Sequence, residues 1–471
     1  MMDSEDTKPI INVLPEKEVA PPLGKKRLLT VEPVIVLYAM YYATALLIAE
    51  QYVFSVESEQ YNYTEHKNLS ACASDNDSMH QLQLQEEVQS KSSYVILLIT
   101  MCWSILAMVS TLFIGAYSDT GGRKTAILIP ILGGLIKCLT FVIVIWLKGS
   151  YWYLIIGFAI EGVSGGITAT LMGCFSYIAD VSTHKGRTLR VTILEVCIGI
   201  AMAISMSASG YMIEALGFLY PFIALVGINF LNIAYIVFLL PETRVQGEPI
   251  KNLFRISMFT KPFRLFITND GTKRRWKLQL LMFTMIVVAM ASLAKMDPTT
   301  YFLKGQPLCF NPVQIGYYAG GSNLALNLGS LLAVKLLINR IEDLWLMAMG
   351  CVSGAASMVL FAFSTQIWMV ALVPVIGCLG YLTVPIVRGY SSKLVTPDEQ
   401  GALFAAIAFA EALSNLIGVT GLDAAYAHTL YIMPGFVFII MAGIYLAGLS
   451  LTCLQLWLTK WEVKKELRSV N

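Results

Sequence analysis

The chain has 471 residues, of which 56% are hydrophobic and 14% are charged, and its mean hydropathy is +0.66. This balance excludes an ordinary soluble domain and is typical of a protein embedded in a lipid bilayer. The formal net charge of +2 is small, so the distribution of charges along the chain is more informative than their sum.

The first half of the chain alternates between long apolar stretches and short polar gaps. Residues 1–30 contain no apolar run and carry Pro15, Pro21 and Pro22, which predicts a disordered cytoplasmic leader. A helix needs about 20 apolar residues to cross the hydrocarbon core. Stretches of this kind lie at residues 33–53, 93–115, 125–147, 151–178, 191–213 and 218–240. They predict an N-terminal bundle of six helices over residues 31–240.

The second half repeats this pattern after a polar cytoplasmic linker at residues 241–277. Its apolar stretches lie at residues 278–303, 313–337, 343–364, 368–392, 400–424 and 430–458. They predict a C-terminal six-helix bundle over residues 278–459, followed by a cytoplasmic tail at residues 460–471. The expected fold is therefore an all-α membrane protein with 12 transmembrane helices in two halves.

The positive charges predict which side of the membrane each loop occupies. Lys and Arg cluster at residues 25–27, 123–124, 185–190, 273–275 and 464–468. If the helices alternate in direction, all these clusters fall on one side. Because cytoplasmic loops carry an excess of Lys and Arg, we expect this side and both chain ends to be cytoplasmic.

The predicted loop at residues 55–92 marks the opposite, exoplasmic face. It contains three N-x-S/T sequons, at Asn62, Asn68 and Asn76, which predicts glycosylation during insertion in the secretory pathway. Seven of the nine cysteines lie within apolar segments, whereas Cys72 and Cys309 lie in predicted exoplasmic loops. An oxidising compartment favours their pairing, so we expect a disulfide.

A compact charged motif separates the second and third predicted helices. Gly115, Asp119, Gly122, Arg123 and Lys124 spell G-x-x-x-D-x-x-G-R-K. Charges in such a short gap are costly unless they pair where helices meet. The bias of positive charge toward the cytoplasm would account for the two cations alone, but it requires neither the carboxylate nor the glycines. The motif therefore predicts a conformational latch.

Three acids and two cations within the predicted membrane spans are candidates for a functional role. A charge near the bilayer centre costs at least about 2.5–3.5 kcal/mol, so each one needs a partner or a cavity. Glu161, Glu195 and Glu411 are candidates for proton coupling, the alternative being a static hydrogen bond between helices. Arg388 is a candidate for binding an anion through its guanidinium, or it extends to the membrane surface. Lys137 either pairs with an acid such as Glu161 or serves substrate binding.

Several motifs resemble known families. The segment at residues 115–124 resembles the loop between helices 2 and 3 of the major facilitator superfamily, and Pro241-Glu242-Thr243-Arg244 resembles a motif found just after helix 6 of such transporters. A second resemblance rests on seven segments, at residues 31–33, 51–52, 85–89, 307–309, 315–317, 392–395 and 399–404. In these segments the chain is similar to solute carrier family 46, which contains a proton-coupled folate transporter, a thymic stromal cotransporter and a lysosomal member.

The family resemblance implies roles for individual residues. Glu195 matches a helix-5 glutamate tied to proton coupling in the folate transporter, and Arg388 matches a helix-10 arginine linked to proton and substrate binding. Glu411 matches a glutamate of the lysosomal member where the folate transporter has asparagine. A disulfide shared by the family fits Cys72 and Cys309.

Three positions depart from the folate transporter. Its helix-7 histidine corresponds here to Ser292, its helix-4 arginine to Phe158 and its helix-4 aspartate to Gly166.

The resemblance implies a secondary active transporter that moves an organic anion by alternating access and couples it to protons, in the plasma membrane or the lysosomal membrane. The family suggests folate-like compounds, steroid sulfates, cyclic dinucleotides or muropeptides as cargo. No spacing typical of a catalytic triad, a metal site or a nucleotide loop occurs, so we expect no enzymatic activity, no cofactor, no metal and no nucleic-acid partner. The alternative is a receptor or scaffold that retains the fold without transport. Oligomeric state is not indicated.

Overall fold

Helices are the only regular secondary structure in the described part of the chain, joined there by short turns and irregular segments. The computed structural model describes residues 30–60, 78–183, 186–244, 249–268, 273–304, 308, 310, 312–337, 340–429 and 433–470. Cys72 and Cys309, together with Asn62, Asn68 and Asn76, lie outside the described residues. The disulfide and the glycosylation sites therefore stay predictions, as does the disordered leader.

The N-terminal half holds seven α-helices, because the fourth predicted span is divided in two. These helices are α1 (Glu32–Gln60), α2 (Ser78–Gly121), α3 (Arg123–Trp146), α4 (Leu154–Val163), α5 (Gly166–Val181), α6 (Arg187–Leu216) and α7 (Leu219–Phe238), with a 3-10 turn η1 (Tyr151–Tyr153) before α4. The division falls at Gly165 and Gly166, whose φ angles of 88° and 49° favour glycine.

The linker forms its own short helix, and the C-terminal half follows. The linker contains the 3-10 turn η2 (Ile250–Asn252) and α8 (Ile256–Ile267). The C-terminal helices are α9 (Arg274–Leu293), α10 (Met296–Lys304), α11 (Pro312–Leu337), α12 (Asp343–Ala362), α13 (Ile367–Ile376), η3 (Gly377–Leu382), α14 (Thr383–Leu394), η4 (Pro397–Glu399), α15 (Gln400–Thr429) and α16 (Phe436–Val470).

Some helices extend further than the apolar stretches predict. Helices α1 and α2 both continue into the predicted loop at residues 55–92, and α16 continues through most of the predicted tail. These extensions are rich in Glu, Gln, Lys and Arg, which sustain a helix well outside the membrane. Hydropathy marks the membrane-crossing part of a helix and not its full length.

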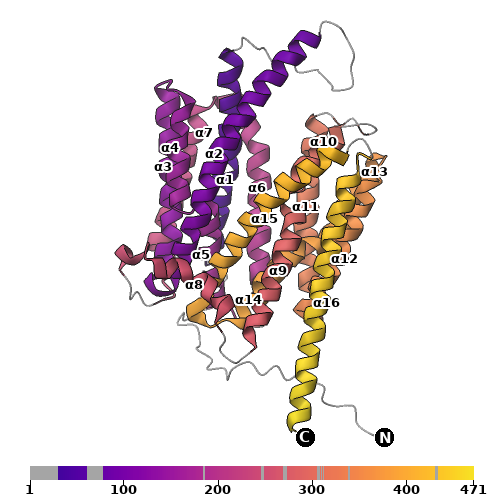
Figure 1. The fold of residues 1–471 in the computed structure, drawn as a ribbon. Helices are drawn as coiled ribbons and strands as arrows, with labels where there is room; N and C mark the ends of the chain where they lie inside the picture. The colour runs from indigo at the N-terminus through magenta and orange to yellow at the C-terminus, as the bar shows by residue number, and fades with distance from the viewer. Residues whose placement is uncertain are drawn as a thin grey trace.

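Within the described residues, eleven helical segments are long and apolar enough to cross a membrane. The one predicted span missing from these eleven is residues 313–337. This span forms α11, but its composition is not apolar enough for it to count as a membrane-crossing helix. Its glycines and Asn323 and Asn327 lower its hydropathy. Helix α11 nevertheless lies among the others in the C-terminal half (Figure 1). The chain is therefore a multi-pass, all-helical membrane protein.

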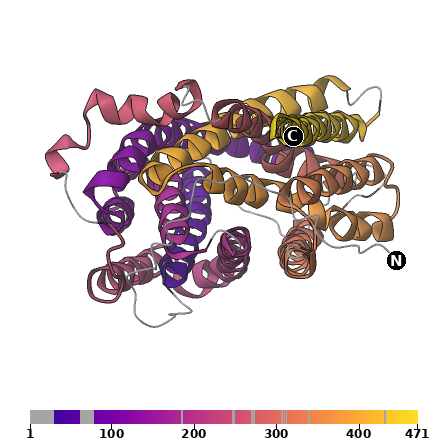
Figure 2. The ribbon, with the colours of Figure 1, turned by 90° about the horizontal axis from the view of Figure 1, so that it is seen from below.

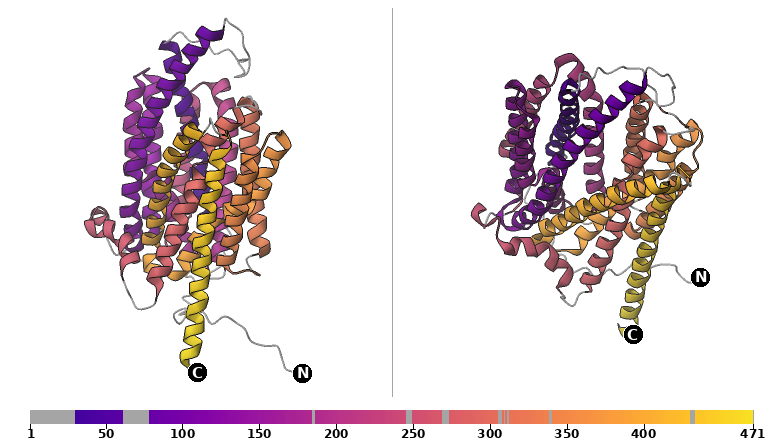
Figure 3. Two further views of the ribbon diagram at one scale, coloured as in Figure 1. Left: turned by 45° about the vertical axis from the view of Figure 1, so that its right-hand side comes forward. Right: turned by 45° about the horizontal axis from the view of Figure 1, so that its top comes forward.

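The two halves lie side by side and meet along four pairs of helices. Helix α15 is strongly tilted and crosses from the C-terminal half to α2 and α5, whereas α6 packs against α11 and α14 (Figures 1 and 3). We call the end of the bundle that holds residues 119–124, 241–244 and 396–402 the latch end. Seen from below, helix α8 runs along the outer edge of the bundle, where it contacts α2 and α15 (Figure 2).

Small residues allow the halves to approach closely. A Cβ atom on Gly389 of α14 would lie 2.8 Å from the hydroxyl of Thr188 in α6, and Phe175 of α5 stacks on Phe404 of α15 with ring centroids 5.8 Å apart. In lipid, close packing of this kind drives helix association because lipid tails are as apolar as the helices.

Candidate functional site

A break in the helix pair α13–α14 positions Arg388. The chain passes from α13 through the 3-10 turn η3 into α14, with Pro374 before the turn and Pro385 just after it. Proline lacks the N–H that an uninterrupted helix would use, which explains why the break lies between them. Arg388 follows in the second turn of α14 and is largely buried.

The guanidinium of Arg388 lies between two carboxylates. It pairs with Glu195 of α6, from the other half of the molecule, and with Glu411 of α15. Its central carbon lies 4.5 Å from the centre of the Phe175 ring in α5, which adds a cation–π contact. The side chain of Arg388 is 7% exposed and each glutamate side chain is 16% exposed. Three of the sequence-predicted residues thus form one cluster, which we call the triad.

The triad has more negative than positive charge. When all three groups are ionised, two carboxylates share one guanidinium and one negative charge is uncompensated. An anion that approaches Arg388 must compete with both carboxylates. Protonation of either glutamate removes this excess and releases guanidinium donors, of which arginine has five in a fixed geometry. Proton binding and anion binding can therefore favour each other here.

Lys137 and Glu161 form a separate pair inside the N-terminal half. The Lys137 ammonium lies 2.7 Å from Glu161, and both side chains are almost completely inaccessible. The hydroxyls of Tyr41 and Tyr38 donate to the same carboxylate at 2.8 and 3.3 Å. Of the two possibilities for Lys137, the structure contains the pairing with Glu161. Roles for these two residues in coupling or substrate binding remain predictions.

The motif at residues 115–124 joins the two halves at the latch end. Asp119 accepts hydrogen bonds from the backbone N–H groups of Gly401 and Ala402 at 2.7 and 3.2 Å. These groups belong to the first turn of α15, where a carboxylate is favoured by the helix dipole. Asp119 is also 2.9 Å from both Arg123 and Lys261. One buried carboxylate therefore connects α2, α8 and α15.

Arg123 and Lys124 differ in their surroundings. Arg123 is fully buried, and its guanidinium lies 2.9 Å from both Asp119 and Asp180. Lys124 donates to the carbonyl of Val237 at 2.8 Å in a more exposed position. Gly122 precedes both with a φ of 108°, which turns the chain from α2 into α3.

Two further residues of the latch were not assigned to it from the sequence. Asp180, at the C-terminal end of α5, accepts from Arg123 and also from Arg244, each at 2.9 Å. Glu242 accepts from the backbone N–H groups of Arg123 and Lys124 at 2.9 and 3.0 Å. Glu242 could have been found from the sequence because it belongs to the motif at residues 241–244, whereas Asp180 lies in no recognisable motif.

Other contacts connect the halves at the same end. Arg244 lies 2.7 Å from Asp398, and Arg187 of α6 donates to the carbonyl of Ser392 in α14 at 2.7 Å. Charged and polar groups from both halves therefore join the two halves at the latch end.

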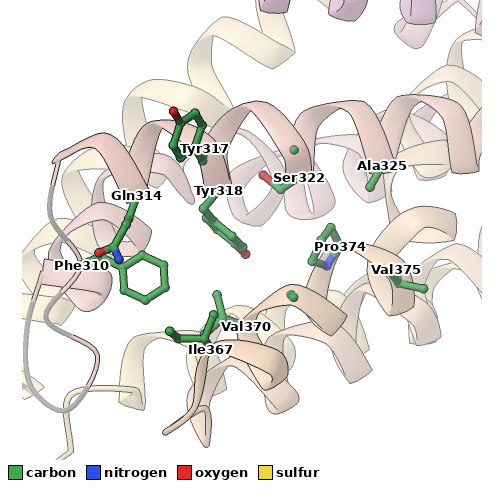
Figure 4. A pocket seen from close by; sticks show the side chains of 12 residues that line it. Phe310, Gln314, Tyr317, Tyr318, Ser322, Ala325, Ile367, Val370, Pro374 and Val375 are labelled. Carbon is green, nitrogen blue, oxygen red and sulfur yellow. The ribbon is translucent and has the colours of Figure 1, made fainter.

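An uncharged pocket lies between α11 and α13. Its volume is 390 Å³, and Tyr318 and Ser322 of α11 face Ile367, Val370 and Pro374 of α13 across it (Figure 4). None of its lining residues is ionisable near neutral pH, so it offers no charge to anchor an anion. It is lined by none of the triad residues.

Comparison with known proteins identifies the family. Residues 78–419 match the Major Facilitator Superfamily. The lysosomal proton-coupled steroid conjugate and bile acid symporter SLC46A3 of Rattus norvegicus is 31% identical over 428 residues, which cover 88% of this chain and 91% of the relative. The chain belongs to this superfamily, within solute carrier family 46. The proton-coupled folate transporter of Rattus norvegicus, 27% identical over 437 residues, covers 91% of this chain and 94% of its own length.

Solved structures agree with the superfamily fold. The human organic anion transporter MFSD10 has a TM-score of 0.67 at 13% identity, covering 90% of this chain and 97% of its own. The fucose:proton symporter FucP of E. coli has a TM-score of 0.65 at 10% identity, covering 90% and 98%. The family resemblance and the fold class expected from the sequence are confirmed, and the chain belongs to a family of membrane transporters.

Proposed function

We propose that this family 46 member is a symporter that moves an organic anion together with protons by alternating access. The observation that carries the proposal is the triad, in which Arg388 of the C-terminal half lies between Glu195 of the N-terminal half and Glu411. These groups come from both halves, as a site between two rocking bundles requires.

Coupling follows from competition for one guanidinium. In the unloaded state the two carboxylates pair with the guanidinium of Arg388 and repel the negatively charged cargo. A proton on Glu195 or Glu411 neutralises that carboxylate, so the anion of the cargo can take its place on the guanidinium. By linkage, bound cargo favours the protonated state by the same factor. An acidic compartment would therefore load both ligands together.

The latch supports the conformational part of the proposal. Asp119 holds the first turn of α15, and Arg244 and Arg187 join the halves nearby. To open the latch end, the transporter must break these contacts and solvate the charges. A set of interactions that exists only in the closed state biases the equilibrium between two conformations.

The cargo that we favour is a steroid sulfate or a similar amphipathic anion. Two relatives that are 31% and 30% identical to this chain are named as symporters of steroid conjugates and bile acids. Two positions that are charged or titratable in the folate transporter are occupied here by Phe158, which packs against Lys137, and Ser292, which shares a hydrogen bond with Tyr445 at 2.9 Å. Folate-like compounds, cyclic dinucleotides and muropeptides are the other candidates. Because those relatives are named lysosomal, we favour the lysosomal membrane over the plasma membrane.

Uptake into proteoliposomes tests the proposal directly. The purified chain should accumulate a labelled steroid sulfate when the outside is acidic, and an uncoupler that collapses the pH gradient should abolish accumulation above equilibrium. A folate, a cyclic dinucleotide and a muropeptide tested in parallel decide the cargo class. Saturable binding of an anion without uptake under any gradient would instead support the alternative of a receptor or scaffold that retains the fold.

A further inference from the structure

The linker segment that comprises η2 and α8 carries an excess of positive charge that the latch does not use. Residues 249–268 contain four cations and no carboxylate. Lys261 donates to Asp119 at 2.9 Å. Lys251, Arg255 and Arg264 are exposed, and no carboxylate partner for them occurs among the described residues. The linker therefore presents three cations outward at the latch end.

Large apolar side chains are exposed beside these cations. Phe254, Ile256 and Ile267 are 61%, 75% and 66% exposed, while Pro262 and Leu265 face inward and are buried. A soluble surface rarely combines three such side chains with cations on one short segment, here residues 251–267. An interfacial helix of a membrane protein has this combination, with apolar groups at the acyl boundary and Lys or Arg among the headgroups.

The position of α8 agrees with this assignment. The helix lies at the outer edge of the bundle, near the latch end (Figures 1 and 2). Its Phe259 packs against Phe113 of α2 with ring centroids 5.4 Å apart, and its Phe263 packs against Phe409 of α15 at 5.7 Å. Because α2 and α15 cross the membrane, α8 is held at the depth where a span meets the headgroups.

We propose that α8 docks on anionic phospholipids of the leaflet at the latch end. Lys251, Arg255 and Arg264 contact the headgroups, and arginine suits phosphate and carboxylate because its guanidinium makes two parallel hydrogen bonds. Phe254, Ile256 and Ile267 enter the upper acyl region. The complementarity of charge selects anionic lipids over zwitterionic ones.

Lipid docking has a consequence for the latch. Helix α8 contacts both halves, through Phe113 and Phe409, and supplies Lys261 to the carboxylate of Asp119. A docked α8 is held in the position that completes this cluster, so anionic lipid stabilises the closed latch end. The lipid composition of the leaflet thereby tunes the conformational equilibrium, whatever the transported cargo is.

Hydrogen–deuterium exchange on the full chain in nanodiscs tests this inference without any transport assay. The probes are nanodiscs of phosphatidylcholine alone and nanodiscs in which about a third of the lipid is phosphatidylserine. Phosphatidylserine should slow backbone exchange of α8 and of residues 115–124 by about threefold or more, because docking reduces local opening. The variant Arg255→Gln/Arg264→Gln should lose this difference, since both side chains are exposed and the change leaves packing intact.

A matched control distinguishes an effect of the cations around α8 from a general effect of positive charge at this end of the molecule. Lys335→Gln/Arg340→Gln removes two exposed cations from the same end of the C-terminal half and should keep the full effect of phosphatidylserine. Equal loss in both double variants, or no effect of phosphatidylserine on the wild type, overturns the proposal. In a final comparison, glycerophosphoserine, the soluble headgroup, is added to nanodiscs of phosphatidylcholine alone. If it slows exchange as phosphatidylserine does, the partner is a soluble anion and the membrane assignment is wrong.

Discussion

Gly115 of α2 and Gly401 of α15 meet backbone to backbone at the latch end. A Cβ atom on Gly115 would lie 2.7 Å from the carbonyl oxygen of Gly401, and a Cβ atom on Gly401 would overlap the carbonyl oxygen of Gly115. Backbone atoms cannot move aside as flexible side chains can. This close crossing of α2 and α15 therefore depends on the absence of a side chain at both positions.

The first prediction concerns this crossing. Gly401→Ala should force α2 and α15 apart, and overpacking of this kind costs about 1–3 kcal/mol, enough to reduce initial uptake about tenfold. Gly421→Ala lies in the same helix where nothing surrounds the added methyl within 4 Å, so it should transport like the wild type. Uptake by equal amounts of monodisperse protein checks both. Similar rates for the two variants would mean that the crossing has no role in transport.

The second prediction ranks the two cations of the motif. Arg123→Lys should reduce uptake about tenfold or more, because a lysine cannot contact Asp119 and Asp180 at once with the geometry of a guanidinium. Lys124→Gln removes one exposed hydrogen bond to a carbonyl, worth about 0.5–1.5 kcal/mol, and should change uptake by less. Kinetic measurements on both variants decide the order. The opposite ranking would contradict the assignment of Arg123 as the centre of the latch.

The third prediction concerns the sealed pair in the N-terminal half. Lys137→Met leaves the carboxylate of Glu161 buried without its cation, which should destabilise the protein by about 3–5 kcal/mol. In Lys137→Met/Glu161→Gln no charge remains, and the amide can still accept from Tyr41, so most stability should return. Thermal unfolding in detergent measures both effects.

The double variant also tests the roles that the sequence suggested for this pair. Both side chains are almost inaccessible in this conformation, so we expect the stable double variant to retain uptake. A stable protein that has lost proton-driven uptake would support a role for Glu161 in coupling or for Lys137 in substrate binding.

The fourth prediction concerns pH. Uptake by the wild type should rise as the outside becomes more acidic, because protons on Glu195 or Glu411 release Arg388. Glu411→Gln resembles the protonated form at every pH. The ratio of uptake at neutral pH to uptake at acidic pH should therefore rise, which flattens the dependence of uptake on pH. Glu195→Gln should do the same, and the double variant should respond least. Initial rates between about pH 5 and about pH 7.5 measure these profiles.

Glu214→Gln is the matched control for the pH profile. Glu214 lies on α6, as Glu195 does, but it is exposed and belongs to no part of the triad. Its substitution should leave the profile unchanged. A wild-type profile in Glu195→Gln and Glu411→Gln as well would remove both glutamates from the coupling mechanism.

Part of this architecture follows from the sequence alone. Whether a segment crosses a membrane depends on the number of consecutive apolar residues, which is a local property, so the spans and the two-half organisation can be predicted without a structure. The motif at residues 115–124 likewise identified Asp119 and Arg123 as a coherent group, because charges so close together in an apolar chain need a shared explanation. Only α11 fails the composition test, because its small and polar residues dilute the signal.

The partners of each charge were decided by the tertiary structure. The sequence gives Glu161, Glu195 and Glu411 equal standing as intramembrane acids, but helix packing pairs the first with Lys137 and brings the other two to Arg388. The same packing brings Asp180 to Arg123 and α8 to the latch. Hydropathy and motif spacing describe neighbours along the chain, whereas an ion pair depends on which helix faces meet. That geometry is set by the packing of whole helices and is not encoded in any short segment.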